Sequence, residues 1–88
     1  MNPDMNKALA ELKAAQESRE APAAALAKLQ AEYGELGQKA AHATTDPERT
    51  AILREQYLVG NAQTAPAKLV AAADERIRLA RLAVGKSA

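Results

Sequence analysis

Residues 22–40 read PAAALAKLQAEYGELGQKA, and the spacing of their apolar side chains decides the fold. Leu26, Leu29, Tyr33, Leu36 and Ala40 follow one another in alternating steps of three and four residues. That spacing is typical of the heptad seam of a helix that packs along another helix. The same register extends backwards through Met5, Ala8, Leu12 and Ala15. The stretch therefore predicts an all-α fold with coiled-coil-like packing.

The second half of the chain repeats this register. Pro3 and Pro22 are 19 residues apart, as are Pro47 and Pro66, and the two pairs are offset by 44 residues in a chain of 88. Shifting the first register by the same offset reaches mostly apolar residues: Ile52, Val59, Pro66, Val70, Ala73, Ile77, Ala80 and Val84. Few residue identities are shared, so duplication of one helical unit and two independent helical arms both stay open.

The clearest boundary lies at residues 42–48, which read HATTDPE. Thr and Asp favour the cap of a helix, Pro47 suits its first turn, and Glu48 complements the helix dipole. We expect a turn at about 41–46 that joins an arm of residues 3–42 to an arm of residues 46–85, in one domain spanning 1–88. Asn2-Pro3-Asp4 is the expected start of the first arm. Short connections favour antiparallel neighbours, so the prediction is a helical hairpin.

Each arm contains a point where it is expected to break or kink. In the first arm that point is Pro22, and Gly34 and Gly37 indicate either fraying or close approach of another backbone. In the second arm Gly60 suits the left-handed position after a helix, and Thr64 is expected to cap a last helix that ends at Gly85. Full breaks in both arms would give a small helical bundle instead of a hairpin.

Composition makes the core of such a hairpin thin. The chain has no Phe, Trp or Cys, its only aromatic residues are Tyr33 and Tyr57, and much of its 48% hydrophobic content is alanine. Alanine favours helices but buries little area, and a chain of this length is marginal without disulfides, metals or oligomerisation. We therefore expect a homo-oligomer. No apolar run reaches the roughly 18 residues that span a membrane, and the expected location is the cytoplasm.

Catalysis finds little support among the residues. His42 is the only histidine, it lies in the predicted turn, and the chain has no cysteine to complete a zinc site. The segment Gly34-Glu35-Leu36-Gly37 lacks the spacing and the lysine of a phosphate-binding loop. The sequence therefore predicts neither an enzyme nor a cofactor or metal site.

A basic stretch near the C-terminus gives the alternative function. Arg76, Arg78, Arg81 and Lys86 are candidate nucleic-acid contacts, because phosphate binding needs such charges. They also suit the negative end of a helix dipole, and Arg78 is well placed for a pair with Asp74 four residues earlier. A helix-turn-helix at residues 48–84, with its turn at Gly60, is the matching DNA-binding architecture.

Residues 55–65 read EQYLVGNAQTA and locally resemble the start of phage small terminase subunits. Those subunits show a Tyr-Leu-Val helix end followed by Asn-Ala and a Thr/Gln pair. The resemblance implies DNA recognition in an oligomeric packaging complex. Gln63-Thr64 stand in the opposite order to the commonest pattern, and residues 70–73 replace the family's downstream turn.

The favoured function is protein binding by oligomeric assembly, or by occluding a macromolecular partner as an assembly factor or inhibitor would. Aromatic side chains on alanine-rich helices are candidate anchors of an interface. The candidate residues for a partner or oligomer interface are Leu26, Leu29, Tyr33, Leu36, Tyr57, Leu58 and Ile77.

Overall fold

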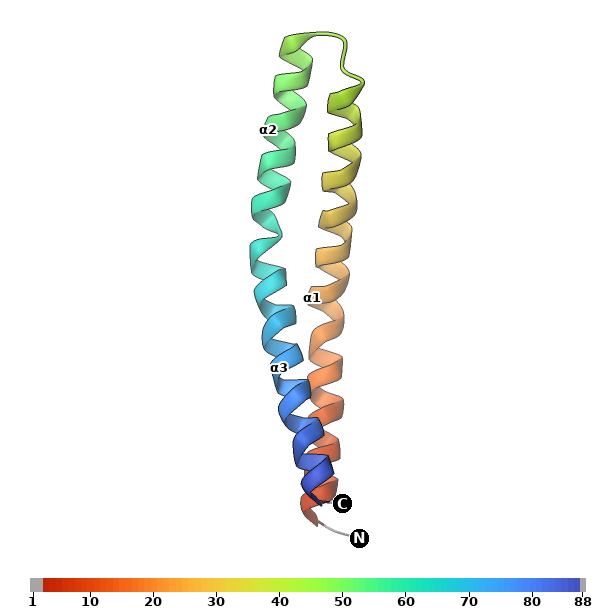
Figure 1. The fold of residues 1–88 in the computed structure, drawn as a ribbon, viewed down its shortest axis with the longest axis vertical. Coiled ribbons are helices and arrows are strands. Elements are labelled where there is room, and N and C mark those ends of the chain that lie inside the picture. The colour runs from red at the N-terminus through yellow and green to blue at the C-terminus, as the bar shows by residue number, and fades with distance from the viewer. Residues whose placement is uncertain (1–2, 88) are drawn as a thin grey trace.

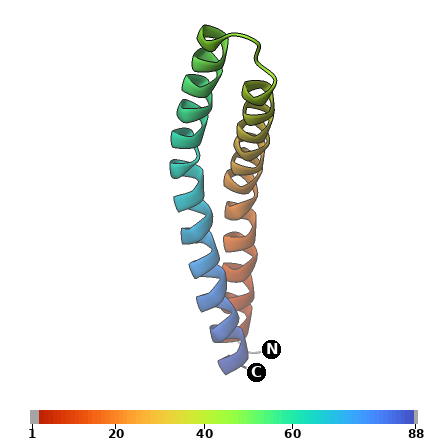
Figure 2. The same cartoon turned by 45° about the horizontal axis from the view of Figure 1, so that its top comes forward.

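The chain forms an extended helical hairpin in a computed structural model that describes residues 3–87. α1 spans Pro3–Ala41, α2 spans Asp46–Ala62, and α3 spans Thr64–Ser87. α2 and α3 follow one another along the same side of α1, so the start of α1 and the end of α3 lie at one end (Figure 1; Figure 2). The molecule measures 67 × 15 × 15 Å. The predicted all-α hairpin is confirmed. Asn2, expected to cap α1, lies outside the described residues.

α1 is a single helix of 39 residues that runs through Pro22 without a break. Proline has no N–H, so the carbonyl of Ser18 loses its usual helical donor. Pro22 is nevertheless half-buried between the arms, and strong helix formers surround it. Packing along the second arm thus outweighs the local cost of the proline. A full break at Pro22, the alternative that would have produced a four-helix arrangement, does not occur.

The second arm is interrupted at one residue, Gln63. Its N–H donates to the carbonyl of Gly60 at 3.3 Å, the tighter pattern of a 3₁₀ turn. The helix is interrupted at this residue because Pro66 has no N–H to donate to the carbonyl of Ala62. The predicted left-handed stop at Gly60 is wrong, since Gly60 lies inside α2 and no described residue has a positive φ.

Two expected helix ends in α3 also differ from the structure. Thr64 is the first residue of α3 rather than a cap before it, and the helix continues past Gly85 to Ser87. Both expectations rested on local propensity alone. Continuous packing against α1 keeps the chain helical at both places.

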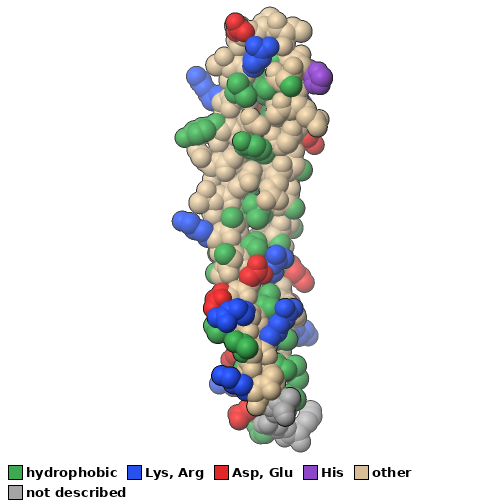
Figure 3. Space-filling view, viewed as in Figure 1, with side chains coloured by type: hydrophobic (Ala, Val, Ile, Leu, Met, Phe, Trp, Pro, Cys, Tyr) green, Lys and Arg blue, Asp and Glu red, His purple; other side chains and the backbone are tan. Residues whose placement is uncertain are grey.

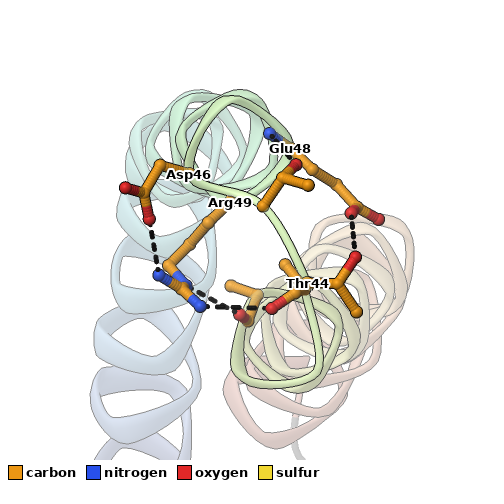
Figure 4. Close-up of polar contacts among 7 residues, drawn as sticks. Thr44, Asp46, Glu48 and Arg49 are labelled. Carbon is orange, nitrogen blue, oxygen red and sulfur yellow. Dashed lines mark hydrogen bonds and ion pairs between the residues drawn. The ribbon is translucent and has the colours of Figure 1, made fainter.

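The turn at residues 42–45 is held by side chains from the start of α2 (Figure 4). Thr45 has an extended backbone, and its hydroxyl accepts a hydrogen bond from the N–H of Glu48 at 3.3 Å. The Arg49 guanidinium donates to the carbonyl of Ala40 in the last turn of α1 at 3.4 Å and to that of Ala43 in the turn at 3.1 Å, and it pairs with Asp46 at 3.2 Å. A cation at the C-terminal carbonyls of a helix complements its dipole. A turn residue therefore caps the start of α2, and a side chain of α2 caps the end of α1.

The seam between the arms follows the predicted heptad register, and it is thin. The buried hydrophobic residues are Ala8, Ala15, Leu36, Ala40, Ala43, Ala73, Ile77 and Ala80. All of these positions except Ala43, seven of the eight, belong to the first predicted register or to its shifted copy in α3, and six of the eight residues are alanine. α2 contributes no buried residue. Because alanine removes little apolar area from water, this seam contributes modest stability to the monomer.

Candidate interaction surface

Two contacts between the arms set their register in the half of the hairpin near the turn. The Gln56 side-chain amide donates to the carbonyl of Tyr33 at 3.1 Å. The same amide nitrogen would lie 3.0 Å from a Cβ added to Gly37. The ring of Tyr33 lies 3.1 Å from the corresponding position on Gly60. Gly37 and Gly60 thus each make room for a side chain of the opposite arm, and of the two alternatives at Gly37, fraying and close approach, the helix does not fray.

Gly34 has no such explanation within the chain. A Cβ built on Gly34 would meet nothing within 4 Å, although the residue lies in the interior of α1. Glycine at such a position costs about 1 kcal/mol relative to alanine. No contact of this hairpin accounts for the absence of a side chain there.

Near the termini, polar side chains link the arms at the surface. Arg19 of α1 pairs with Asp74 of α3 at 2.6 Å, and Arg76 donates to the hydroxyl of Ser18 at 3.3 Å. The predicted pair between Asp74 and Arg78 is wrong, because Asp74 is taken by the opposite arm. Arg78 pairs instead with Glu75, one turn before it, at 2.6 Å.

The ion pair between Glu75 and Arg78 shifts the pKa values of both side chains. The hydrogen bond from Arg78 lowers the pKa of the Glu75 carboxyl below its ordinary value, and the same bond raises the pKa of Arg78. Both side chains are well exposed, so solvent screens the interaction. The pair supports one turn of α3 and leaves the seam untouched.

Four of the seven residues predicted for an interface pack inside the hairpin. Leu36 and Ile77 are each 8% exposed and lie between the arms. Leu26 and Leu29 are half-buried in the same seam. Their apolar area is largely used by the contact of α1 with the second arm. Their role toward a partner stays a prediction.

The other three predicted interface residues are open to solvent. Tyr33 is 43% exposed, Leu58 61% and Tyr57 68%. They belong to a larger set of exposed large hydrophobic residues: Leu9, Tyr33, Leu53, Tyr57, Leu58, Leu69, Leu79 and Leu82. Six of the eight lie on α2 and α3, so the second arm carries most of the exposed large hydrophobic side chains.

The predicted nucleic-acid residues are exposed but do not form one patch. Arg76 lines a hollow with Glu11 and Leu79, on the side of α3 that faces Ser18. Arg78 and Arg81 line a different hollow, together with Asp74. Lys86 is exposed in the last turn of α3. Their role in binding nucleic acid stays a prediction.

The arrangement of α2 and α3 also bears on the helix-turn-helix hypothesis. In that motif two helices meet at about 90–120° across a turn of three or four residues. Here a single residue separates α2 from α3, and the two helices continue along the same side of α1 (Figure 1; Figure 2). Residues 48–84 therefore form one continuous, curved arm in this structure (Figure 1; Figure 2).

One broad face of the hairpin, here named the charged face, carries charged side chains from both arms. Near the turn, Glu32, Glu35 and Lys39 of α1 lie beside Glu55 of α2 around a shallow hollow. Toward the termini, Glu11 and Arg76 lie around the next hollow on this side. Charge of both signs thus runs along most of the length of this face.

The opposite face is named here the uncharged face. In α1, Gly34 and Gly37 lie about half a turn from Glu32 and Glu35, and in α2 Leu53 and Tyr57 lie half a turn from Glu55. From these positions, steps of three and four residues define two stripes: Ala23, Ala27, Gln30, Gly34, Gly37 and Ala41 in α1, and Leu53, Tyr57, Gly60, Thr64, Ala67 and Ala71 in α2 and α3. The ring of Tyr33, which precedes Gly34, contacts Gly60 of the second stripe. Neither stripe contains a charged residue, and Lys68, four residues after Thr64, borders the second one.

Continuing the same two stripes toward the termini changes their character. Glu20 and Lys13 precede Ala23 in α1, and Asp74, Arg78 and Arg81 follow Ala71 in α3. Figure 3 shows this segregation on one side of the molecule. Charged side chains gather over α3 and the first half of α1, whereas hydrophobic and uncharged side chains dominate the upper half, where charges lie toward the edges.

Sequence reasoning found the seam and missed the uncharged face. The missed residues include Leu53, Gly60 and Gln56, of which the first two lie in the uncharged stripe and the third crosses the seam. One signal was present in the sequence: between Glu55 and Asp74 the only charged residue is Lys68. A helical stretch that long with one charge indicates a surface that is not simply solvated.

Comparisons of the chain with protein-family models, curated proteins and solved structures found no match. The terminase resemblance therefore rests on residues 55–65 alone. None of the helices within residues 3–87 is both long enough and apolar enough to cross a membrane.

Proposed function

We propose that this chain is a non-enzymatic helical protein–protein interaction module that acts by oligomeric assembly or by occluding a macromolecular partner. The observation that carries the proposal is an imbalance in burial. Eight large hydrophobic side chains are exposed, while no large side chain among the described residues is fully buried. A hairpin that stayed alone in water would leave these large hydrophobic side chains, most of them on the second arm, uncovered.

The exposed area supports the same proposal. The chain exposes 6271 Å². A compact monomer of 9.3 kDa is expected to expose about 5,000 Å², so the excess is about 1,300 Å². A standard protein interface removes about 800 Å² from each partner. One such interface would bring the chain much closer to the area of an ordinary folded protein.

The proposal is tested by sedimentation equilibrium of the purified chain over a wide range of protein concentrations, with thermal unfolding measured in parallel. Self-assembly predicts a mass above that of one chain and an unfolding midpoint that rises with concentration. A folded monomer with a constant midpoint at every concentration would contradict oligomeric assembly.

The alternative is DNA binding through Arg76, Arg78, Arg81 and Lys86. It has less support in the structure, since Arg78 is paired with Glu75 and Arg76 points toward Ser18 on another side of α3. DNA affinity that falls steeply with salt, and that is lost on replacing the three arginines, would favour this alternative.

A further inference from the structure

We propose that the uncharged face is the contact between two copies of this chain, which pack antiparallel into a four-helix bundle through the halves near their turns. This inference rests on the proposed oligomeric function and names the surface and geometry that carry it. In the dimer, α2 and the start of α3 of one copy lie along the same segments of the other. The two α1 helices lie along each other in the same way.

The first argument is the distribution of charge over the two faces. The charged face carries Glu32, Glu35 and Lys39 opposite Glu55, and burying these groups against another chain would require a partner for each one. The uncharged face has no such requirement between Ala23 and Ala41 of α1. These 19 residues cover about 28 Å of helix, enough for four turns or more of one helix to pack on another.

The second argument is Gly34. The other two glycines near the middle of the hairpin make room for Gln56 and the ring of Tyr33, but nothing in the chain approaches Gly34. Small residues in a helix face allow a neighbouring helix to come close. A second copy seated on the uncharged face would occupy the open space above Gly34, and the glycine then has the same role as Gly37 and Gly60.

The third argument selects antiparallel packing. The part of this face near the termini bears charged side chains of both signs: Lys13, Arg19, Arg78 and Arg81 with Glu20, Asp74 and Glu75. A parallel pair of hairpins would bury these two charged ends against each other, and each charge would need a partner there. A two-fold axis across the middle of the uncharged stretch, near residue 62 of the second arm, instead directs the two charged ends away from each other. The uncharged stretch of one chain then packs on the same stretch of the other chain.

The first experiment compares two alanines of α1 that are both exposed, Ala27 on the uncharged face and Ala25 seven residues before Glu32 on the charged face. Ala27→Arg is expected to raise the dimer dissociation constant at least about tenfold, as measured by sedimentation equilibrium, since it introduces an unpaired charge into the contact. Ala25→Arg should leave the constant unchanged. Circular dichroism checks that both variants keep the helical content of the parent chain.

Gly34→Ala separates a packed glycine from a solvated one. If Gly34 faced only water, alanine would raise helix stability and leave association alone. We expect the opposite pattern for association: a dissociation constant raised severalfold, with helicity equal to or above that of the parent. Unchanged association of Gly34→Ala would overturn the role assigned to this residue.

The orientation is tested by disulfide cross-linking, which is clean because the chain has no native cysteine. Leu53 and Ala71 lie equally far from residue 62. A mixture of Leu53→Cys and Ala71→Cys should therefore give a mixed disulfide dimer, while neither variant links to itself. In a parallel dimer Leu53→Cys would link to Ala41→Cys instead, and that result would overturn the antiparallel geometry.

The possible results distinguish failure of the proposed dimer contact from failure of oligomeric assembly itself. A parent chain that is monomeric at all concentrations contradicts oligomeric assembly and the dimer together. A parent chain that associates, but is disrupted by Ala25→Arg and not by Ala27→Arg, keeps the oligomeric function and overturns the uncharged face as its contact.

Discussion

The two arms pack together more completely in the half of the hairpin near the termini than in the half near the turn. The first, residues 3–22 with 71–87, contains five of the eight buried residues and the Arg19–Asp74 pair between the arms. The second, residues 23–70, contains the remaining three, and α2 supplies none of them. The terminal half is better packed and charged outside, whereas the turn half is thinly packed and carries the uncharged face. The hairpin is therefore best packed in the half whose outer surface is charged. The turn half is the part to which we assign the dimer contact.

The largest expected effect comes from truncating one isoleucine in each half of the hairpin, Ile77 in the terminal half and Ile52 in the turn half. Ile77→Ala removes a side chain that is 8% exposed in the terminal half, and we expect it to lower the free energy of unfolding by about 2–3 kcal/mol. Ile52→Ala removes a half-buried side chain of α2, and its cost should be about 1 kcal/mol. Urea unfolding at concentrations where the chain is monomeric measures both. Equal losses would break the distinction between the two halves.

A smaller effect is expected at the turn. Thr45→Ala removes the hydroxyl that accepts from the N–H of Glu48 and should cost about 1 kcal/mol. Thr44→Ala is the matched control, because its hydroxyl makes only a 3.5 Å contact with the Glu48 carboxylate. Amide exchange in the first turn of α2 should rise in the Thr45 variant alone. A similar rise in both variants would show that the cap does not hold this end.

The smallest expected effect is on the loss of stability at acid pH. Arg78 lowers the pKa of Glu75, so the pair adds stability that is present above the ordinary value near 4.5 and is lost as pH falls through the lowered value. Glu75→Gln should therefore flatten part of the acid dependence of the urea midpoint. Glu17→Gln, at another exposed glutamate, is the comparison. An acid dependence that Glu75→Gln leaves unchanged would remove this pair from the account.

The fold was predictable because its signal extends over the whole chain. The alternating steps of three and four residues continue from Met5 to Ala40 and reappear from Ile52 to Val84, so the register does not depend on any one residue. The turn was equally readable, since Thr45, Pro47 and Glu48 each favour a helix start for a separate physical reason.

The errors came from signals that depend on a single residue. Gly60 and Gly85 were expected to end helices, and both lie inside helices, whereas of the two alternatives left open at Pro22, a break and a kink, only the break is excluded. Local propensity is worth about 1–3 kcal/mol at such sites, which continuous packing along the opposite arm can exceed. Gln56 was missed because a polar residue in a seam is recognised only when its partner, the carbonyl of Tyr33, is known.

The most direct test of the central claim is amide hydrogen exchange of the parent chain at low and high protein concentration. The account predicts that protection of residues 23–41 and 53–71 rises with concentration, because a second copy covers the turn half. Protection near Ala8, Ile77 and Ala80 should rise far less, since the terminal half lies beyond the overlap. Protection that rises first in the terminal half, or that does not change with concentration at all, would contradict the account.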